Sequence, residues 1–96
     1  RPSAVVTLND LIAIQVVAAC RELDLGIPQD LAIVSFDDDH SASLMTPMLT
    51  TVRQQAYEMG ARAANLLLDV VSGEPVQQQV FLPVELIVRQ SCGAGA

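Results

Sequence analysis

The stretch that decides the fold is residues 31–40, Leu-Ala-Ile-Val-Ser-Phe-Asp-Asp-Asp-His. Its first six residues form an almost unbroken apolar run, which is typical of a strand covered on both faces in a parallel sheet. Three aspartates and a histidine follow directly. In open α/β sheets, ligands bind in the crevice beyond the carboxyl ends of the strands. The stretch therefore predicts an α/β fold with a ligand site next to Asp37.

The residues before this stretch predict a strand and a helix. Residues 4–7 are a short β-rich run, and Asn9 and Asp10 offer side-chain oxygens that can cap a helix. Apolar residues then recur every three or four positions over residues 11–25, until Gly26 and Pro28 end the pattern. These segments form a βαβ unit with the strand at 31–36. Because parallel strands end at the same edge, Asn9 and Asp37 are expected to converge.

The residues after it predict the rest of an α/β layout in the order β-α-β-β-α-β-β. The expected segments are a helical turn at 41–45, a strand at 49–53, a helix at 54–71, two short strands within 76–89 kinked at Pro83, and a frayed tail at 91–96. Gly60, Ala61 and Ala64 would let the second helix approach whatever it packs on.

Composition narrows the possible functions. The chain has 96 residues and a net charge of −6, and its five basic residues are scattered arginines. This surface repels phosphate backbones, so we do not expect this part of the protein to bind nucleic acid. No apolar run reaches the roughly 20 residues that span a membrane. The first residues contain neither an initiator Met nor a secretory signal, which suggests a fragment.

The two cysteines, Cys20 and Cys92, are far apart and lack metal-ligand or redox spacing. They point to a reducing compartment, the cytoplasm. Cys20 lies on the apolar face of the first predicted helix, so a core thiol is the favoured interpretation over a reactive one. We find no phosphate loop, nucleophile elbow or metalloprotease helix, and we expect neither enzymatic activity nor a cofactor.

Two residues at the strand ends have more than one interpretation. From its chemistry alone, Asp37 is a solvated loop carboxylate or a ligand contact. Asn9 is foremost a helix cap, with a ligand contact as the second interpretation. The run from Asp37 to His40 could suggest a metal site. Successive side chains point in different directions, however, and no second cluster supplies ligands, so we expect no metal.

Four strings along the chain resemble the lactose/galactose repressor family of transcription regulators. They are residues 8–13 (LNDLIA), 33–38 (IVSFDD), 49–54 (LTTVRQ) and 82–89 (LPVELIVR). Each string is weak alone, but their order and spacing together are specific. The resemblance implies a periplasmic-binding-protein-like (type I) fold, with two α/β lobes and an effector such as a sugar between them. It assigns residues 1–90 to the C-terminal part of that sensor. Within it, about 1–50 and 83–90 belong to the C-terminal lobe and about 54–80 to the N-terminal lobe.

The resemblance also implies roles for particular residues. Asn9, Asp37 and Gln54 match positions that contact the effector, and Ala56 takes a place often held by a larger apolar residue. Ser35 stands where the family usually has Gly. A further set matches the surface at which two copies of the C-terminal lobe meet in a homodimer, although the same residues could instead be core: Leu44, Met45 and Met48.

The sequence thus predicts the effector-sensing portion of a transcriptional regulator, which reaches operator DNA only through an N-terminal domain outside this chain. The alternatives are a piece of an extracytoplasmic sugar-binding protein and, with less support, a small α/β enzyme. The resemblance further implies that the helix at 54–71 lacks its native sheet here. We therefore expect the isolated chain to self-associate.

Overall fold

The structure is a computed structural model, and it describes residues 2–94. The described chain divides into two compact units, with boundaries between Gln54 and Gln55 and between Val84 and Glu85. We call residues 2–54 and 85–94 the sheet unit, and residues 55–84 the helix unit. The sheet unit therefore joins both ends of the described chain, and the helix unit is an insertion between them in sequence.

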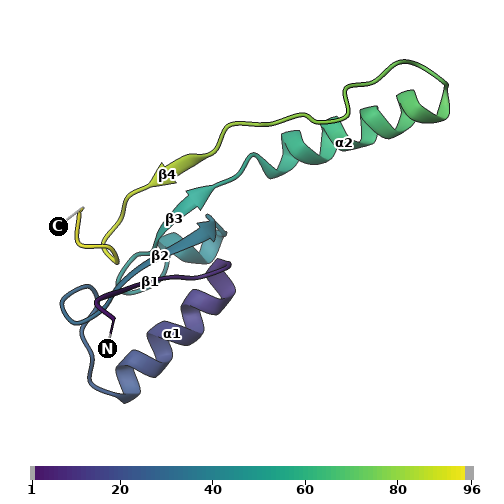
Figure 1. Cartoon of the computed structure of the whole chain (residues 1–96). Helices are drawn as coiled ribbons and strands as arrows, with labels where there is room; N and C mark the ends of the chain where they lie inside the picture. The colour runs from purple at the N-terminus through teal and green to yellow at the C-terminus, as the bar shows by residue number, and fades with distance from the viewer. Residues whose placement is uncertain (1, 95–96) are drawn as a thin grey trace. The chain divides into compact units, whose positions relative to one another are not determined.

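The sheet unit contains four strands in the order β1-β2-β3-β4 (Figure 1). They are β1 (Ala4–Val6), β2 (Ala32–Asp37), β3 (Thr50–Arg53) and β4 (Glu85–Ile87). The first three strands are parallel, as predicted, but β4 is antiparallel to β3, so the sheet is mixed. The chain leaves the sheet unit after β3 and returns to it as β4. Strand β4 lies beside β3 and runs in the opposite direction. No strand forms across the described residues 76–84, where the sequence predicted one.

Helix α1 (Asp10–Glu22) begins where the sequence predicted, with Asn9 as its cap. The Asn9 side-chain oxygen accepts a hydrogen bond from the backbone N–H of Ile12 at 2.9 Å, which satisfies one of the free donors of the first turn. The helix ends at Glu22, three residues before the predicted end at residue 25, because Asp24 turns the chain with a φ of 55°. Cys20 is buried, which confirms its predicted place in the core.

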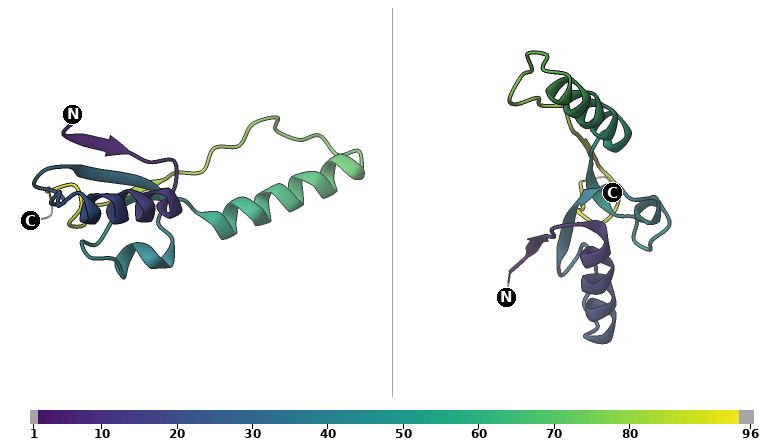
Figure 2. Two further views of the ribbon diagram at one scale, coloured as in Figure 1. Left: turned by 90° about the horizontal axis from the view of Figure 1, so that it is seen from below. Right: turned by 90° about the vertical axis from the view of Figure 1, so that its right-hand side faces the viewer.

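One face of the sheet carries the hydrophobic core. Helix α1 and the short 3-10 helix η1 (His40–Ser43) lie on the same side of the strands (Figure 2). Their buried residues meet a residue of β2 and the residue before β3 in one cluster: Ala13, Val17, Ile33, Ala42 and Leu49. Met45 packs against this cluster. The core therefore lies directly beneath the strands whose ends carry the candidate ligand residues.

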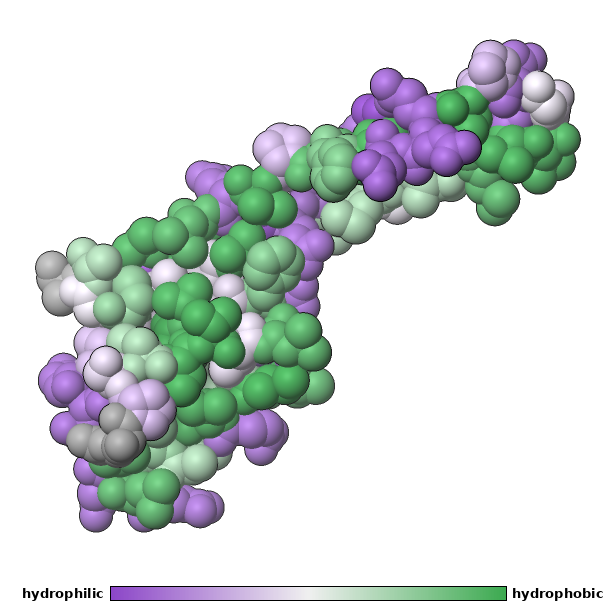
Figure 3. All heavy atoms as spheres, viewed as in Figure 1, coloured by the Kyte–Doolittle hydropathy of each residue, from purple (hydrophilic) through white to green (hydrophobic). Residues whose placement is uncertain are grey.

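The opposite face of the sheet is uncovered within the sheet unit, contrary to the expectation that both faces of β2 would be covered. Ile33 and Ser35 are buried on the covered face, whereas Phe36 and Val6 on the other face are exposed. Figure 3 shows apolar side chains gathered over this face. The apolar run of β2 predicted a strand covered on both faces, but no element of the described sheet unit lies on the second face.

The residues after β4 differ from the predicted frayed tail. Ser91 is fully buried, and its hydroxyl donates to the backbone oxygen of Ile33 at 2.6 Å and accepts from the backbone N–H of Thr50 at 2.9 Å. Ser91 also accepts, through its backbone oxygen, from the N–H of Ile33 at 2.9 Å. The prediction was wrong at Ser91 because this residue satisfies polar backbone groups of β2 and β3. Residues 95–96 of the predicted tail lie outside the described residues.

The helix unit contains α2 (Ala56–Val71) and the extended segment that follows it. All of α2 is described, and none of its residues is buried. The helix ends at Ser72, and Gly73 adopts a φ of 78° that favours glycine. Gln55 donates a side-chain hydrogen bond to the backbone oxygen of Pro83 at 3.1 Å, which ties the two ends of the unit together. Within the described chain nothing lies close to Gly60, so the predicted close approach is not made here.

Candidate functional site

Asn9 and Asp37 lie at the carboxyl ends of two neighbouring parallel strands: Asn9 follows β1, and Asp37 is the last residue of β2. Val6 of β1 pairs with Val34 of β2, so each candidate residue lies three positions beyond a paired residue, on the same edge of the sheet. Asp37 is exposed and Asn9 is half-buried. The Asn9 side-chain oxygen caps α1. The structure thus brings to one edge the two strand ends that the sequence predicted to converge.

Gln54 joins this edge from β3. Its side-chain nitrogen donates a hydrogen bond of 2.6 Å to a carboxylate oxygen of Asp37. The two residues are 17 positions apart in sequence and meet because Asp37 pairs with Arg53, the residue before Gln54, in the β2–β3 register. Ala56 lies in the helix unit, where it opens α2 with its side chain exposed. Two of the predicted ligand residues are therefore in direct contact.

Asp38 has a different environment from Asp37, and sequence reasoning gave it no role. One of its carboxylate oxygens accepts from Nε of Arg53 at 2.7 Å, and the other accepts from Nη1 of Arg89 at 2.8 Å. Its side chain is only 9% exposed. Burial raises the pKa of Asp38, but the hydrogen bonds and positive charges of Arg53 and Arg89 prevail and lower the pKa below its ordinary value. We call Asp38, Arg53 and Arg89 the arginine clasp.

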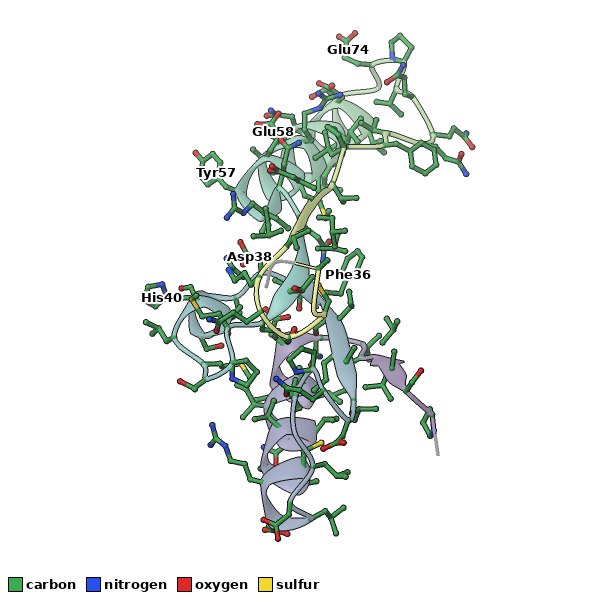
Figure 4. The ribbon with its side chains drawn as sticks, turned by 90° about the vertical axis from the view of Figure 1, so that its left-hand side faces the viewer. Phe36, Asp38, His40, Tyr57, Glu58 and Glu74 are labelled. Atoms are coloured by element: carbon green, nitrogen blue, oxygen red, sulfur yellow. The ribbon has the colours of Figure 1, made fainter. Side chains whose placement is uncertain are left out.

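The clasp connects three segments at the end of the sheet. Figure 4 labels Asp38 in the loop that follows β2, while Arg53 ends β3 and Arg89 follows β4. Arg53 also lies 4.0 Å from Glu85, its partner in the β3–β4 register. The hydrogen bond and charge of Asp38 raise the pKa of Arg53. The only signal in the sequence was that both arginines belong to the strings that resemble the family.

Asp10 is a buried carboxylate that anchors the same loop. It is 1% exposed, and its two oxygens accept from the hydroxyl of Thr51 at 2.8 Å and from the backbone N–H of Asp39 at 2.7 Å. The hydroxyl of Thr51 also accepts from the backbone N–H of Asp38 at 3.2 Å. The sequence indicated Asp10 only as part of a helix cap, and its contacts 29 and 41 residues away arise from the tertiary fold.

Ser35, which departs from the family's usual glycine, has a defined partner. It is 1% exposed, and its hydroxyl accepts a hydrogen bond from the hydroxyl of Thr7 at 2.7 Å. Thr7 is also buried, and it directly precedes the turn that carries Asn9. The serine therefore joins β2 to the segment after β1 through a side-chain contact that glycine cannot make.

The remaining acidic residue of the run, Asp39, caps η1. Its carboxylate accepts from the backbone N–H of His40 at 2.9 Å. Across residues 2–94, no group of three or more histidine, cysteine, aspartate or glutamate side chains is arranged to hold a metal ion. None of the helices in that range is long and apolar enough to cross a membrane.

The three residues predicted for a dimer interface or the core differ in their burial. Leu44 is 70% exposed and Met48 is 38% exposed, whereas Met45 packs against the core. Leu44 and Met45 line a surface hollow together with Arg21, whose guanidinium donates to the backbone oxygen of Thr46 at 2.7 Å. Leu44 and Met48 thus remain available to a partner, and Met45 is largely used within the chain.

Comparisons with known proteins agree with this architecture. The model of the periplasmic binding protein-like domain matches residues 1–92. The transcriptional repressor MelR of Bacillus subtilis is 43% identical over 95 residues, which are 99% of this chain and 28% of that protein. The ribose operon repressor of Escherichia coli K12 is 42% identical over 79 residues, 82% of this chain and 24% of that protein. The lactose operon repressor of Rhizobium radiobacter is 40% identical over 91 residues, 95% of this chain and 80% of that protein.

Solved structures are similar over nearly the whole chain. A LacI-family regulatory protein from Chloroflexus aggregans has 45% identity and a TM-score of 0.82, covering 97% of this chain and 34% of that one. A LacI-family regulator from Enterococcus faecium, solved with bound ribose, has 32% identity and a TM-score of 0.84, with 94% and 34% covered. A dimeric Lac repressor has 31% identity and a TM-score of 0.86, with 95% and 34% covered.

The chain spans about a third of these solved proteins and 28% of MelR. Its fold is that of the corresponding part of a LacI-family regulator. The match to the domain model extends over almost every residue, and the lactose operon repressor of Rhizobium radiobacter is covered over most of its own length. The chain belongs to the periplasmic binding protein-like domain family, in its group of lactose-repressor-like (LacI) regulators.

Proposed function

We propose that this chain is the effector-sensing portion of a transcriptional regulator and that it binds a small polyhydroxylated ligand, a sugar. The observation that carries the proposal is the exposed Asp37 carboxylate, held by the Gln54 amide at the edge where β1 and β2 end. Asn9, Asp37 and Gln54 form one wall of the ligand site, and Ala56, at the start of α2, is a further proposed ligand residue. An exposed polar wall at strand ends is where open α/β sheets bind ligands.

The chemistry of this wall suits neutral hydroxyl groups. An ionised carboxylate accepts hydrogen bonds from two hydroxyls, and amides both donate and accept. Capping uses only the oxygen of Asn9, so its amide nitrogen can donate to a ligand. Asp37 forms no salt bridge among the described residues, whereas Asp38 forms two. The negative charge of Asp37 therefore disfavours an anionic ligand such as a sugar phosphate.

The relatives support a sugar as the ligand class. One similar solved structure holds ribose, and two similar repressors are named for the ribose and lactose operons. We assign the sheet unit to the C-terminal lobe of the sensor and the helix unit to its N-terminal lobe. In the complete protein, ligand binding between the lobes would favour one arrangement of them and thereby change the affinity of a separate DNA-binding domain.

The net charge of −6 disfavours direct contact of this chain with DNA. We propose a homodimer in which Leu44 and Met48 contribute exposed apolar surface, in keeping with the dimeric form of a similar Lac repressor. A regulator of this kind acts in the cytoplasm, and sensing of a ligand requires no enzymatic step.

The test is calorimetric titration of the complete protein with D-ribose and lactose, before and after substitution of Asp37→Ala. Loss of a charged hydrogen-bond acceptor costs about 1.5–3 kcal/mol, which corresponds to a roughly 10- to 150-fold weaker affinity. The control is Glu22→Ala, which removes an exposed charge near the far end of α1. Unchanged sugar affinity in Asp37→Ala, or no binding by the unmodified protein, would contradict the proposal.

A further inference from the structure

Two consecutive aspartates at the end of β2 adopt backbone conformations that L-residues rarely adopt. Asp37 has a φ of 121° and Asp38 a φ of 56°. Such strained residues persist only where the surrounding structure holds them, and they occur often at ligand-binding sites.

The side-chain contacts of the turn are concentrated on Asp38. Both of its carboxylate oxygens are occupied, one by Arg53 at 2.7 Å and one by Arg89 at 2.8 Å. Among residues 2–94, the only side-chain partner of Asp37 is the neutral amide of Gln54. The two aspartates thus differ in their surroundings: both oxygens of Asp38 accept from arginines, whereas Asp37 has an exposed carboxylate.

The arginines that hold Asp38 are themselves fixed. Nη1 of Arg89 also donates to the backbone oxygen of Leu49 at 2.9 Å, and its backbone N–H donates to the hydroxyl of Thr50 at 2.8 Å. Arg53 is the last residue of β3, and Gln54 follows it directly. Arg53 therefore links Asp38 to Gln54, whose side chain donates the hydrogen bond to Asp37. Asp38 and the arginine that holds it are therefore the direct chain neighbours of Asp37 and Gln54.

From this geometry we propose that Asp38 is a positioning residue for ligand binding. The arginine clasp holds the strained turn so that the Asp37 carboxylate stays in hydrogen-bonding position with Gln54, ready for ligand hydroxyls. The proposal rests on the proposed sugar-binding function, because Asp38 acts only through Asp37. Preorganisation of this kind raises affinity, since the protein does not have to order the contacting group when the ligand binds.

The turn keeps two backbone anchors that do not depend on the Asp38 side chain. The N–H of Asp38 donates to the hydroxyl of Thr51, and the N–H of Asp39 donates to buried Asp10. An Asp38→Asn variant therefore retains these anchors and keeps the size of the side chain. We expect it to fold, with a turn that samples other conformations.

The experiment is a double-mutant cycle in the complete protein, with D-ribose and lactose as the probes. We expect Asp38→Asn to weaken sugar binding about tenfold when Asp37 is present, and less than about threefold when Asp37 is already Asn, because coupled residues are not additive. Asp39→Asn is the matched control. It removes a neighbouring charge that caps η1 and does not contact the arginines, so sugar affinity should change by less than about twofold.

The possible outcomes separate the two proposals. Sugar binding by the unmodified protein combined with unchanged affinity in Asp38→Asn would overturn the positioning role alone. An equal loss of affinity with and without Asp37 would also overturn it, because Asp38 would then act through the general structure. Absence of binding to either sugar by the unmodified protein would count against the proposed function, and the positioning role would fall with it.

Hydrogen exchange gives a second measurement that does not need a ligand. Loss of the clasp should speed exchange of the backbone amides of Asp38 and Asp39 about tenfold or more, with little change in the core amides of β2. Arg53→Gln is a second variant for the case in which Asp38→Asn does not fold, because Arg53 has a half-exposed side chain. Unchanged exchange in the turn of whichever variant folds would contradict the positioning role.

Discussion

The sheet unit and the helix unit show how differently two parts of one chain can use their apolar residues. In the sheet unit, helix α1 buries Ala13, Val17 and Cys20 against the strands. In the helix unit, α2 is longer, yet all of its described residues keep some solvent exposure. Both helices have apolar periodicity, so the difference is the presence or absence of a sheet face to cover. Helical periodicity therefore predicts a helix, but it does not predict that the chain itself supplies the surface on which that helix packs.

The largest expected effect comes from the core of the sheet unit. Ile33→Ala should destabilise the chain by about 2–5 kcal/mol, because Ile33 of β2 is fully buried in the core cluster with α1. The matched substitution Leu67→Ala in the helix unit, at a position 63% exposed, should cost less than about 1 kcal/mol. Urea unfolding of the 96-residue chain followed by circular dichroism measures both. If the two substitutions destabilise the chain equally, Leu67 must be buried in solution. Self-association of the chain through α2 would have this result.

The next effect concerns the hydrogen bonds of a buried carboxylate. Asp10 of the sheet unit makes such contacts, whereas the acidic residues of α2 are exposed. Asp10→Ala removes the acceptor for both the Thr51 hydroxyl and the Asp39 N–H. Leaving such donors unpaired should cost about 2–3 kcal/mol. The control is Asp69→Ala on exposed α2, which should change the free energy of unfolding by less than about 0.5 kcal/mol. A similar change in both variants would mean that Asp10 is solvated rather than buried.

A third prediction uses pH. The pKa of Asp38 lies below its ordinary value of 3.8 in the folded chain. The folded state therefore favours the ionised form, and the clasp stabilises the fold above pH 3.8. This stabilisation, on the order of 1 kcal/mol for charge-assisted hydrogen bonds, should be lost as the pH falls from 3.8 through the lower folded pKa. Unfolding free energies of the unmodified chain and Asp38→Asn should thus converge in acid. A constant difference across that range would contradict the ion pairs.

The smallest effect tests the hydrogen bond between Thr7 and Ser35. Ser35→Ala removes a buried hydroxyl contact of 2.7 Å and should cost about 1 kcal/mol. Ser72→Ala, at the exposed end of α2, is the counterpart in the helix unit and should be within about 0.5 kcal/mol of zero. Thermal unfolding monitored by calorimetry is sensitive enough to separate them. No difference between the two variants would show that Thr7 finds another partner when Ser35 is lost.

Much of the fold could be predicted because its signals are local. The Asn9 cap, the periodicity of α1 and the apolar run of β2 each arise within about a dozen neighbouring residues, and the structure confirms the helix cap and the parallel pairing of β1, β2 and β3. The convergence of the ends of β1 and β2 followed from a general property of parallel strands. The antiparallel β4 and the buried Ser91 could not be foreseen, because they depend on where the chain returns after the helix unit.

The amino-acid sequence by itself determined which elements form and that polar groups collect where β1 and β2 end. Only the tertiary structure decided how two adjacent aspartates divide their work. Asp38 contacts arginines 15 and 51 positions later in the chain, while Asp37 stays exposed beside Gln54. The physical reason is that a local pattern specifies backbone conformation, whereas ion pairing depends on distances between charges that the fold alone brings within about 3 Å.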